Sequence, residues 1–151
     1  MKNQRNVLIV GSWLKEMMIV VSREILFRSK RTDNGEWIEG YVYRISEKLN
    51  PFIMLKDRHS ESYQVFLETV GQYTGMDDIN GRKIFEGDIV HCKARIDHAN
   101  MFVTFEDGKF VMVLCEEFTT HKRGLGHYEI ECFDKEVIGN IFDNPELIND
   151  D

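Results

Sequence analysis

The sequence predicts a mainly β protein in which short strands form a small barrel or sandwich. Three dipeptides that favour tight turns lie between apolar runs: Asn34-Gly35, Asn80-Gly81 and Asp107-Gly108. Asn-Gly and Asp-Gly adopt the positive φ angles that two-residue hairpins need. Between these turns, apolar and polar residues alternate with the period of a strand, which favours this class over a βαβ fold.

The clearest hairpin is predicted around Asp107-Gly108. With these residues as a two-residue loop, Glu106 faces Lys109 and Phe105 faces Phe110. An opposite-charge pair beside the turn and an aromatic pair behind it each favour this register by about 0.2–1 kcal/mol.

A second hairpin is predicted at Asn34-Gly35. A two-residue loop there places Thr32 opposite Trp37, but it also places Asp33 opposite Glu36. Like charges directly opposite each other are unfavourable. A longer loop with a shifted register is therefore the alternative.

Further strands are expected in four segments: 37–43, 83–92, 128–133 and 136–142. Within the second of these, Glu86-Gly87-Asp88 is expected to form a bend. Glycine permits a sharp change of chain direction, and an aspartate can accept hydrogen bonds from nearby backbone amides. We interpret these three residues, together with Asn80 and Gly81, as a structural turn motif rather than a functional one.

Helix is predicted only near the C-terminus. Asn144 fits an N-cap, Pro145 fits the first helical position and Glu146 supplies an acid in the first turn. A short C-terminal helix of one or two turns is expected there.

Composition narrows the classes of function. The chain has 151 residues and a formal net charge of −7, which argues against nucleic-acid binding because phosphate contacts need a basic surface. Two local basic groups, Arg28 with Lys30 and Arg31, and the loop at 121–123, are interpreted as solvated surface. No continuous apolar run of about 18 residues is present, which disfavours a membrane span. Three irregularly spaced cysteines suit a reducing cytoplasm rather than a disulfide framework.

No catalytic, cofactor or metal site is predicted from the motifs. Asp78 and Asn80 have calcium-loop spacing, but Met76 and Gly87 stand where that loop needs carboxylate ligands. No nucleophile motif is present, so we expect a protein that is not an enzyme. The cysteines and histidines that could hold zinc lack the spacing of zinc ligands: Cys92, Cys115, His121, His127 and Cys132.

Four ordered blocks cover nearly the whole chain. They begin with Arg-Glu-Ile-Leu-Phe-Arg at 23–28 and continue at 34–40, 69–90 and 137–147. Together they resemble the YopX protein family, which is encoded by bacteriophages and prophages. The resemblance implies an SH3-like barrel architecture. It implies no established activity, cofactor or catalytic residue, and a fold alone does not identify chemistry.

The start of the chain departs from the family pattern. Members usually begin close to the first block, whereas here about twenty residues precede it. We therefore expect residues 1–20 to be an N-terminal extension that arises from a misassigned start codon; if it is real, it adds a strand or a loose segment. Residues 21–151 are expected to form the YopX-like domain, divided into two intertwined sub-barrels at about 21–75 and 76–151.

One strand face is the candidate partner-binding surface. Trp37, Tyr41 and Tyr43 share strand parity, so they line one face of residues 37–43. Core packing is the default role for such a face, and an open face would bind a protein or peptide. The sequence therefore favours a phage or prophage accessory protein that binds an unknown host or phage protein.

Three other classes of function stay open at this point. The main alternative is a nucleic-acid-binding or DNA-mimic SH3-like barrel protein that acts in phage–host regulation. An unrecognised enzyme would need a cluster of polar residues in a pocket. A structural protein that self-assembles into homo-oligomers would use exposed strand edges.

Overall fold

The computed structural model describes residues 24–58, 60–93, 98–115, 127–130 and 134–148. Strands dominate these residues, which confirms the mainly β class. The elements are β1 (Phe27–Lys30), β2 (Trp37–Tyr43), β3 (Phe52–Leu55), β4 (Ser62–Gln64), η1 (Leu67–Thr69), β5 (Gly71–Asp77), β6 (Lys83–Phe85), β7 (Asp88–Lys93), β8 (His98–Glu106), β9 (Lys109–Leu114), β10 (His127–Glu129), β11 (Asp134–Asn140) and η2 (Pro145–Leu147).

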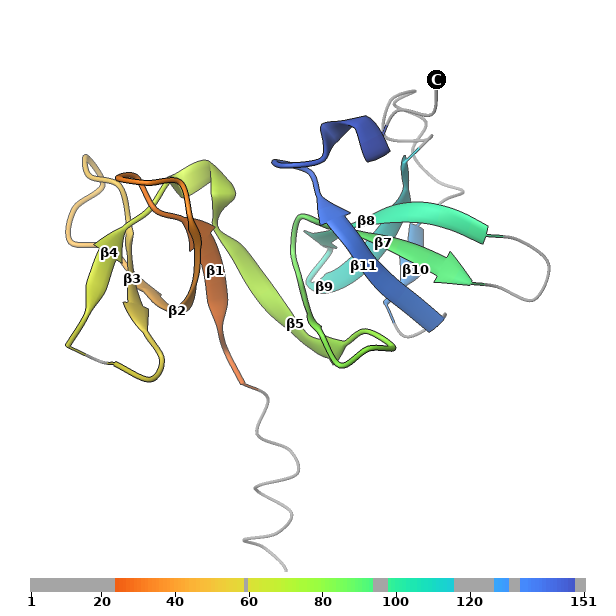
Figure 1. Ribbon diagram of the computed structural model, residues 1–151, viewed down its shortest axis with the longest axis horizontal. Coiled ribbons are helices and arrows are strands. Elements are labelled where there is room, and N and C mark those ends of the chain that lie inside the picture. The colour runs from red at the N-terminus through yellow and green to blue at the C-terminus, as the bar shows by residue number, and fades with distance from the viewer. Residues whose placement is uncertain (1–23, 59, 94–97, 116–126, 131–133, 149–151) are drawn as a thin grey trace, which may run out of the picture.

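The strands form two antiparallel sheets. The first sheet has the order β4-β3-β2-β1-β5-β6 and the second has the order β10-β9-β8-β7-β11. Figure 1 shows the sheets as two lobes, with β5 running from the first lobe toward the second. Each sheet is therefore built from a continuous part of the sequence, and the two parts lie in separate lobes.

Neither sheet closes into a barrel, so the SH3-like barrel architecture that we expected is not found in the described strands. The path of β5 explains the difference. It pairs with β1 through Gly71 and Gln72, and a register shift between Tyr73 and Asp77 then separates the two positions at which it pairs with β6. The edge strands of the first sheet are β4 and β6, and β5 carries the chain to β6 beside the second sheet, away from β4. The segment after β4 returns to the end of β1 only as an isolated bridge between Arg31 and Val65, so no closed barrel forms in the described strands.

The hairpin of β8 and β9 has the predicted register. Glu106 lies opposite Lys109 and Phe105 lies opposite Phe110, with ring centroids 5.0 Å apart at 68°. Asp107 and Gly108 have φ angles of 50° and 82°, as a two-residue turn of this kind requires. The prediction from the Asp-Gly pair is confirmed.

The hairpin of β1 and β2 uses the longer loop. Lys30, rather than Thr32, lies opposite Trp37, so the register is shifted by two residues and every side chain keeps its face. Asn34 explains the shift, because its Oδ1 accepts the Glu36 N–H (3.0 Å) and its Nδ2 donates to the Glu36 carboxylate (2.8 Å).

The second sheet is packed on both faces. Ile89 and Val90 are both fully buried and point to opposite sides of β7, as successive residues of a strand do. Ile84 of β6 covers one side, and Ile148, just after η2, covers the other. β6, a strand of the first sheet, thus completes the core of the second sheet.

The predicted division near residue 75 can be compared with the bounds of the two sheets. That position lies inside β5, and the second sheet begins at Asp88. By hydrogen bonding β6 belongs to the first sheet, but its Ile84 packs into the core of the second. The predicted extension at 1–20 lies outside the described residues.

The predicted C-terminal helix is a single 3-10 turn, η2. Asn144 stands at the N-cap, Pro145 opens the helix and Glu146 lies in the first turn, as predicted. The Asn144 side chain makes no capping bond: its Oδ1 accepts the Asn140 N–H (3.3 Å) and its Nδ2 donates to Glu146 (3.3 Å). The side chain therefore fastens the end of β11 rather than the start of the helix. Within the described residues, no helix has the length and apolarity needed to cross a membrane.

Candidate ligand-binding cleft between the two sheets

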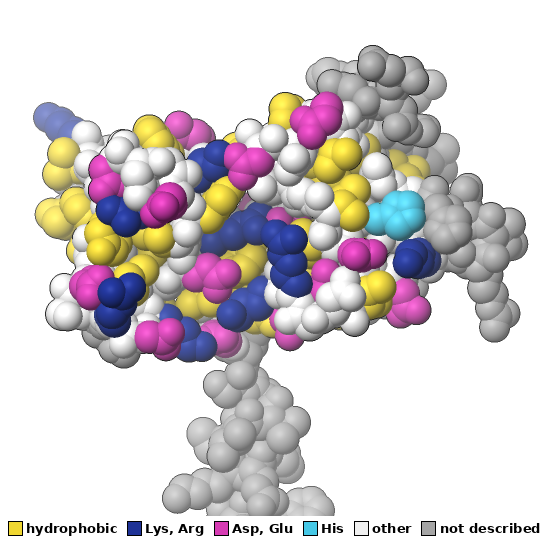
Figure 2. Space-filling model, in the orientation of Figure 1, with side chains coloured by type: hydrophobic (Ala, Val, Ile, Leu, Met, Phe, Trp, Pro, Cys, Tyr) yellow, Lys and Arg dark blue, Asp and Glu magenta, His cyan; other side chains and the backbone are white. Residues whose placement is uncertain are grey.

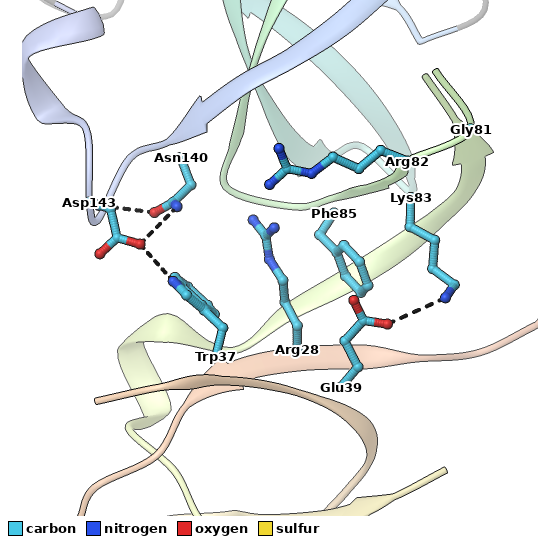
Figure 3. A pocket seen from close by; sticks show the side chains of 9 residues that line it. All are labelled: Arg28, Trp37, Glu39, Gly81, Arg82, Lys83, Phe85, Asn140 and Asp143. Carbon is cyan, nitrogen blue, oxygen red and sulfur yellow. Dashed lines mark hydrogen bonds and ion pairs between the residues drawn. The ribbon is translucent and has the colours of Figure 1, made fainter. Parts of the chain in front are cut away.

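A cleft of about 410 Å³ lies between the two sheets. Figure 2 shows Lys and Arg side chains gathered in the hollow between the lobes, with acidic side chains beside them. The lining comes from β1 and β2, from the turn before β6 with β6 itself, and from the end of β11. The residues that line the cleft are Arg28, Trp37, Glu39, Gly81, Arg82, Lys83, Phe85, Asn140 and Asp143 (Figure 3).

Arg28 forms the floor of the cleft. The residue is only 7% exposed, and its guanidinium lies between the rings of Trp37 and Phe85, with its Cζ 4.9 and 4.8 Å from their centroids. It also forms an ion pair with Asp88, which is fully buried. Aromatic faces attract a cation, so three partners from both sheets fix the position of this charge.

The Glu86-Gly87-Asp88 bend brings Asp88 to Arg28. Gly87 has a φ of 83°, a conformation that suits glycine, and the chain turns there so that Asp88 also accepts the Phe85 N–H (2.8 Å). Burial raises the pKa of the Asp88 carboxyl, and the Arg28 charge opposes that effect. Burial also raises the pKa of Glu86. The bend predicted as structural thus lies directly behind the cleft.

Asp143 fastens the far wall of the cleft to the first sheet. Its carboxylate pairs with Lys30 and accepts the Trp37 indole N–H (2.6 Å) and the Asn140 amide (3.0 Å). These bonds lower the pKa of the Asp143 carboxyl to about 2, and the bond from Lys30 has the largest effect. The Phe142 ring packs beside the Trp37 ring, with 6.0 Å between the two centroids. The C-terminal segment is therefore bound to β1 and β2.

Arg82 supplies the open side of the cleft. Its side chain is exposed and makes no hydrogen bond or ion pair with another described residue; Figure 3 shows it reaching into the cleft. Its backbone is fixed by the turn at Asn80-Gly81. There Asp78 accepts the N–H groups of Asn80 (2.8 Å) and Arg82 (2.9 Å), and Gly81 has a φ of 77°. The turn residues predicted from sequence thus position a cationic side chain.

Lys83 is a second cation in the lining of the cleft, next to Arg82 in the chain. Lys83 lies 3.4 Å from Glu39 in a partly exposed ion pair between β6 and β2. Such a pair contributes little to stability, so the ammonium group can exchange partners easily. The cleft accordingly combines one fixed and two accessible cations.

The aromatic face predicted on β2 is open. Trp37 lines the cleft, and Tyr41 and Tyr43, on the same face of the strand, are 36% and 40% exposed. Tyr43 stacks on Phe52 of β3, with ring centroids 5.5 Å apart at 18°. The structure therefore places this face outside the core and makes it continuous with the cleft.

Sequence reasoning missed the role of the basic residues in β1. Arg28 and Lys30 were expected on a solvated surface, but Arg28 is buried and Lys30 pairs with Asp143. Arg31 is also largely covered, since it pairs with Asp33 and its Cζ lies 3.8 Å from the centroid of the Tyr63 ring. The signal available was strand parity, since Arg28 shares the face of the fully buried Leu26.

Thiols and acids do not converge in the cleft. Cys92 and Cys115 are buried on opposite faces of the second sheet, and burial raises the pKa of Cys92 to about 11. Across the described part of the chain, no group of three or more His, Cys, Asp or Glu side chains could hold a metal ion. His121 and Cys132, considered as zinc ligands above, lie outside the described residues.

The fold and the cleft together define a mainly β protein of two antiparallel sheets with cationic side chains between them. A model of the YopX protein family matches residues 26–149, so the chain belongs to this family. The resemblance found in its sequence blocks is confirmed.

The solved structures that are similar to this chain include the crystal structure of protein EF1440 from Enterococcus faecalis. The identity is 25% and the TM-score is 0.47, with 85% of this chain and 100% of that chain covered. No curated protein sequence matches the chain.

Proposed function

We propose that the chain is a phage or prophage accessory protein that acts by binding another protein in the bacterial cytoplasm. The open face of β2 carries this proposal. Tyr41 and Tyr43 are 36% and 40% exposed and continue from Trp37 at the cleft. Tyrosine and tryptophan are the residues most enriched at the energetic centres of protein interfaces, where they bury large areas at low entropic cost.

The support beneath this face strengthens the proposal. Trp37 is held by its bond to Asp143, and Tyr43 is held by its stack on Phe52. A surface whose side chains are fixed before binding loses less conformational entropy when a partner docks. The exposed aromatic groups are therefore preorganised.

Affinity capture from host lysate tests the proposal. We compare the wild type with the double variant Tyr41→Thr/Tyr43→Thr, because threonine keeps the strand propensity while removing the rings. Ile138→Thr is the matched control, since Ile138 is an exposed strand residue (38%) in the second sheet. Quantitative mass spectrometry should show proteins that the wild type and the control enrich and that the double variant loses by about tenfold or more.

Two outcomes would contradict protein binding through β2. One is reproducible capture of the same proteins by all three forms, and the other is the absence of any reproducible partner. A thermal melt of each variant establishes that the fold is intact before capture is compared.

The cations in the cleft favour nucleic-acid binding as a second candidate. Arg28, Arg82 and Lys83 all line the same space. Anisotropy with a labelled single-stranded oligonucleotide at about 50 and 200 mM salt separates the candidates, because phosphate contacts make affinity fall steeply with salt. A salt-sensitive rise in anisotropy would support this candidate, and capture of a DNA-binding protein without it would indicate mimicry.

A further inference from the structure

We propose that the cleft binds a carboxylate carried by an extended segment of the partner protein, and that an apolar side chain of the same segment lies on Tyr41 and Tyr43. This inference rests on the proposed function and names the chemistry of the partner.

The charge of the cleft matches a single carboxylate. Its lining contains the cations Arg28, Arg82 and Lys83 and the anions Glu39 and Asp143, which leaves a surplus of one positive charge. One carboxylate neutralises this surplus, whereas a phosphate dianion would leave net negative charge in a chain that already carries −7.

The donors suit a carboxylate as well. Arg28 is more than nine-tenths buried, and its Nε, which has no hydrogen-bond partner among the described residues, is itself covered from solvent. The guanidinium of Arg82 makes no ion pair with any described residue. Figure 3 shows the side chains of Arg28 and Arg82 pointing into the cleft. A guanidinium is a planar fork that pairs with a carboxylate through two parallel hydrogen bonds. Arg82 is thus available to hold the ligand while Arg28 provides a fixed charge below it.

The direction of β2 sets the spacing within the ligand. Glu39 lines the cleft and Tyr43 ends the strand on the same face. A strand rises about 3.3 Å per residue, so these positions are roughly 13 Å apart. An extended partner segment spans that distance in about four residues. The expected motif is an acidic residue with an apolar residue about four positions away.

Titration of a short peptide by NMR tests the inference. The probe is acetyl-Glu-Thr-Ser-Thr-Leu-amide, and its matched control has Gln in place of Glu. The reporter is the indole N–H of Trp37, which lines the cleft; Trp13→Phe makes it the only indole in the chain. The Glu peptide should shift this resonance saturably, and the Gln peptide should bind about tenfold more weakly, as expected for a lost charge-assisted pair.

Variants of the protein locate the site. Arg82→Gln should weaken binding of the Glu peptide by about tenfold. Arg58→Gln removes the same charge from an exposed loop position of the first sheet and should leave binding unchanged. Tyr41→Thr/Tyr43→Thr should weaken the Glu peptide by about threefold to tenfold through loss of apolar contact.

Three results would overturn the carboxylate assignment: equal binding of the Glu and Gln peptides, no effect of Arg82→Gln, or tighter binding of inorganic phosphate than of the Glu peptide. The test is separable from that of the proposed function. If lysate capture depends on Tyr41 and Tyr43 while the Glu peptide does not bind, protein binding stands and the carboxylate site is wrong. If the peptide binds as expected while no protein is captured, the carboxylate site stands and the proposed function is wrong.

Discussion

The buried carboxylate of Asp78 binds three backbone amides from two separate segments of the chain. Its Oδ1 accepts the N–H groups of Asn80 and Arg82, and its Oδ2 accepts the Val137 N–H (3.0 Å) from β11. Burial opposes ionisation of this group, but the three amides outweigh it and lower the pKa of Asp78. The residue therefore holds both the turn that carries Arg82 and the neighbouring strand.

Asp78→Ala should destabilise the protein by about 2–3 kcal/mol, because it leaves amide donors without their acceptor in a buried place. For a chain of this size that corresponds to a fall in Tm of roughly 5–10 °C. Urea unfolding followed by circular dichroism measures the change. Asp134→Ala, at an exposed position of β11, is the matched control and should alter stability by less than about 0.5 kcal/mol. Equal effects of the two substitutions would show that the three hydrogen bonds contribute little.

The sequence indicated these residues only in part. Asn80-Gly81 was recognisable as a turn because its residue types are specific to turns. Strand parity with Leu26 pointed to the inward position of Arg28, but its partner was hidden, because Asp88 lies sixty residues further along the chain. Local sequence patterns carry no information about such a pairing.

At the scale of elements, two hairpins show where turn chemistry decides the register. Asp107-Gly108 is supported by the charge pair and the aromatic pair beside it, and the predicted register is found. Asn34-Gly35 has the same kind of dipeptide, but its flanking acids would face each other in a two-residue loop. The loop lengthens, and Asn34 bonds to Glu36 instead. The neighbours of a turn dipeptide therefore matter as much as the dipeptide.

Gly108→Ala should destabilise the protein by about 1–2 kcal/mol. The φ angle of Gly108 is 82°, and an added Cβ would meet no atom within 4 Å, so the cost is one of backbone conformation alone. Asp107→Asn, with asparagine tolerating the φ of 50° at that position, should change stability by less than about 0.5 kcal/mol. Chemical denaturation compares the two. Unchanged stability of the alanine variant would show that the turn readily takes up a different conformation.

At the scale of the whole molecule, a few polar contacts between residues far apart in sequence join the two sheets. Arg28 pairs with Asp88, and Asp143 pairs with Lys30 and binds Trp37, at separations of 60, 113 and 106 residues. The strands and their turns followed from local patterns, but the open arrangement of the sheets and the cleft did not. These depend on contacts that appear only once both sheets have formed.

Acid should weaken the junction made by Asp143 in a defined pH window. The folded state lowers the pKa of this carboxyl to about 2, from an ordinary value of 3.8. A group whose pKa is depressed by folding stabilises the protein above its unfolded pKa, and this contribution disappears as pH falls through the folded pKa. The stability difference between wild type and Asp143→Asn should therefore be constant above about pH 5 and decline toward zero near pH 2. Thermal melts of both proteins in the Trp13→Phe background, followed by Trp37 fluorescence, measure that difference, and pH-dependent changes elsewhere in the chain cancel in it. A difference that stays constant down to pH 2 would mean that the carboxylate does not join the sheets through its charge.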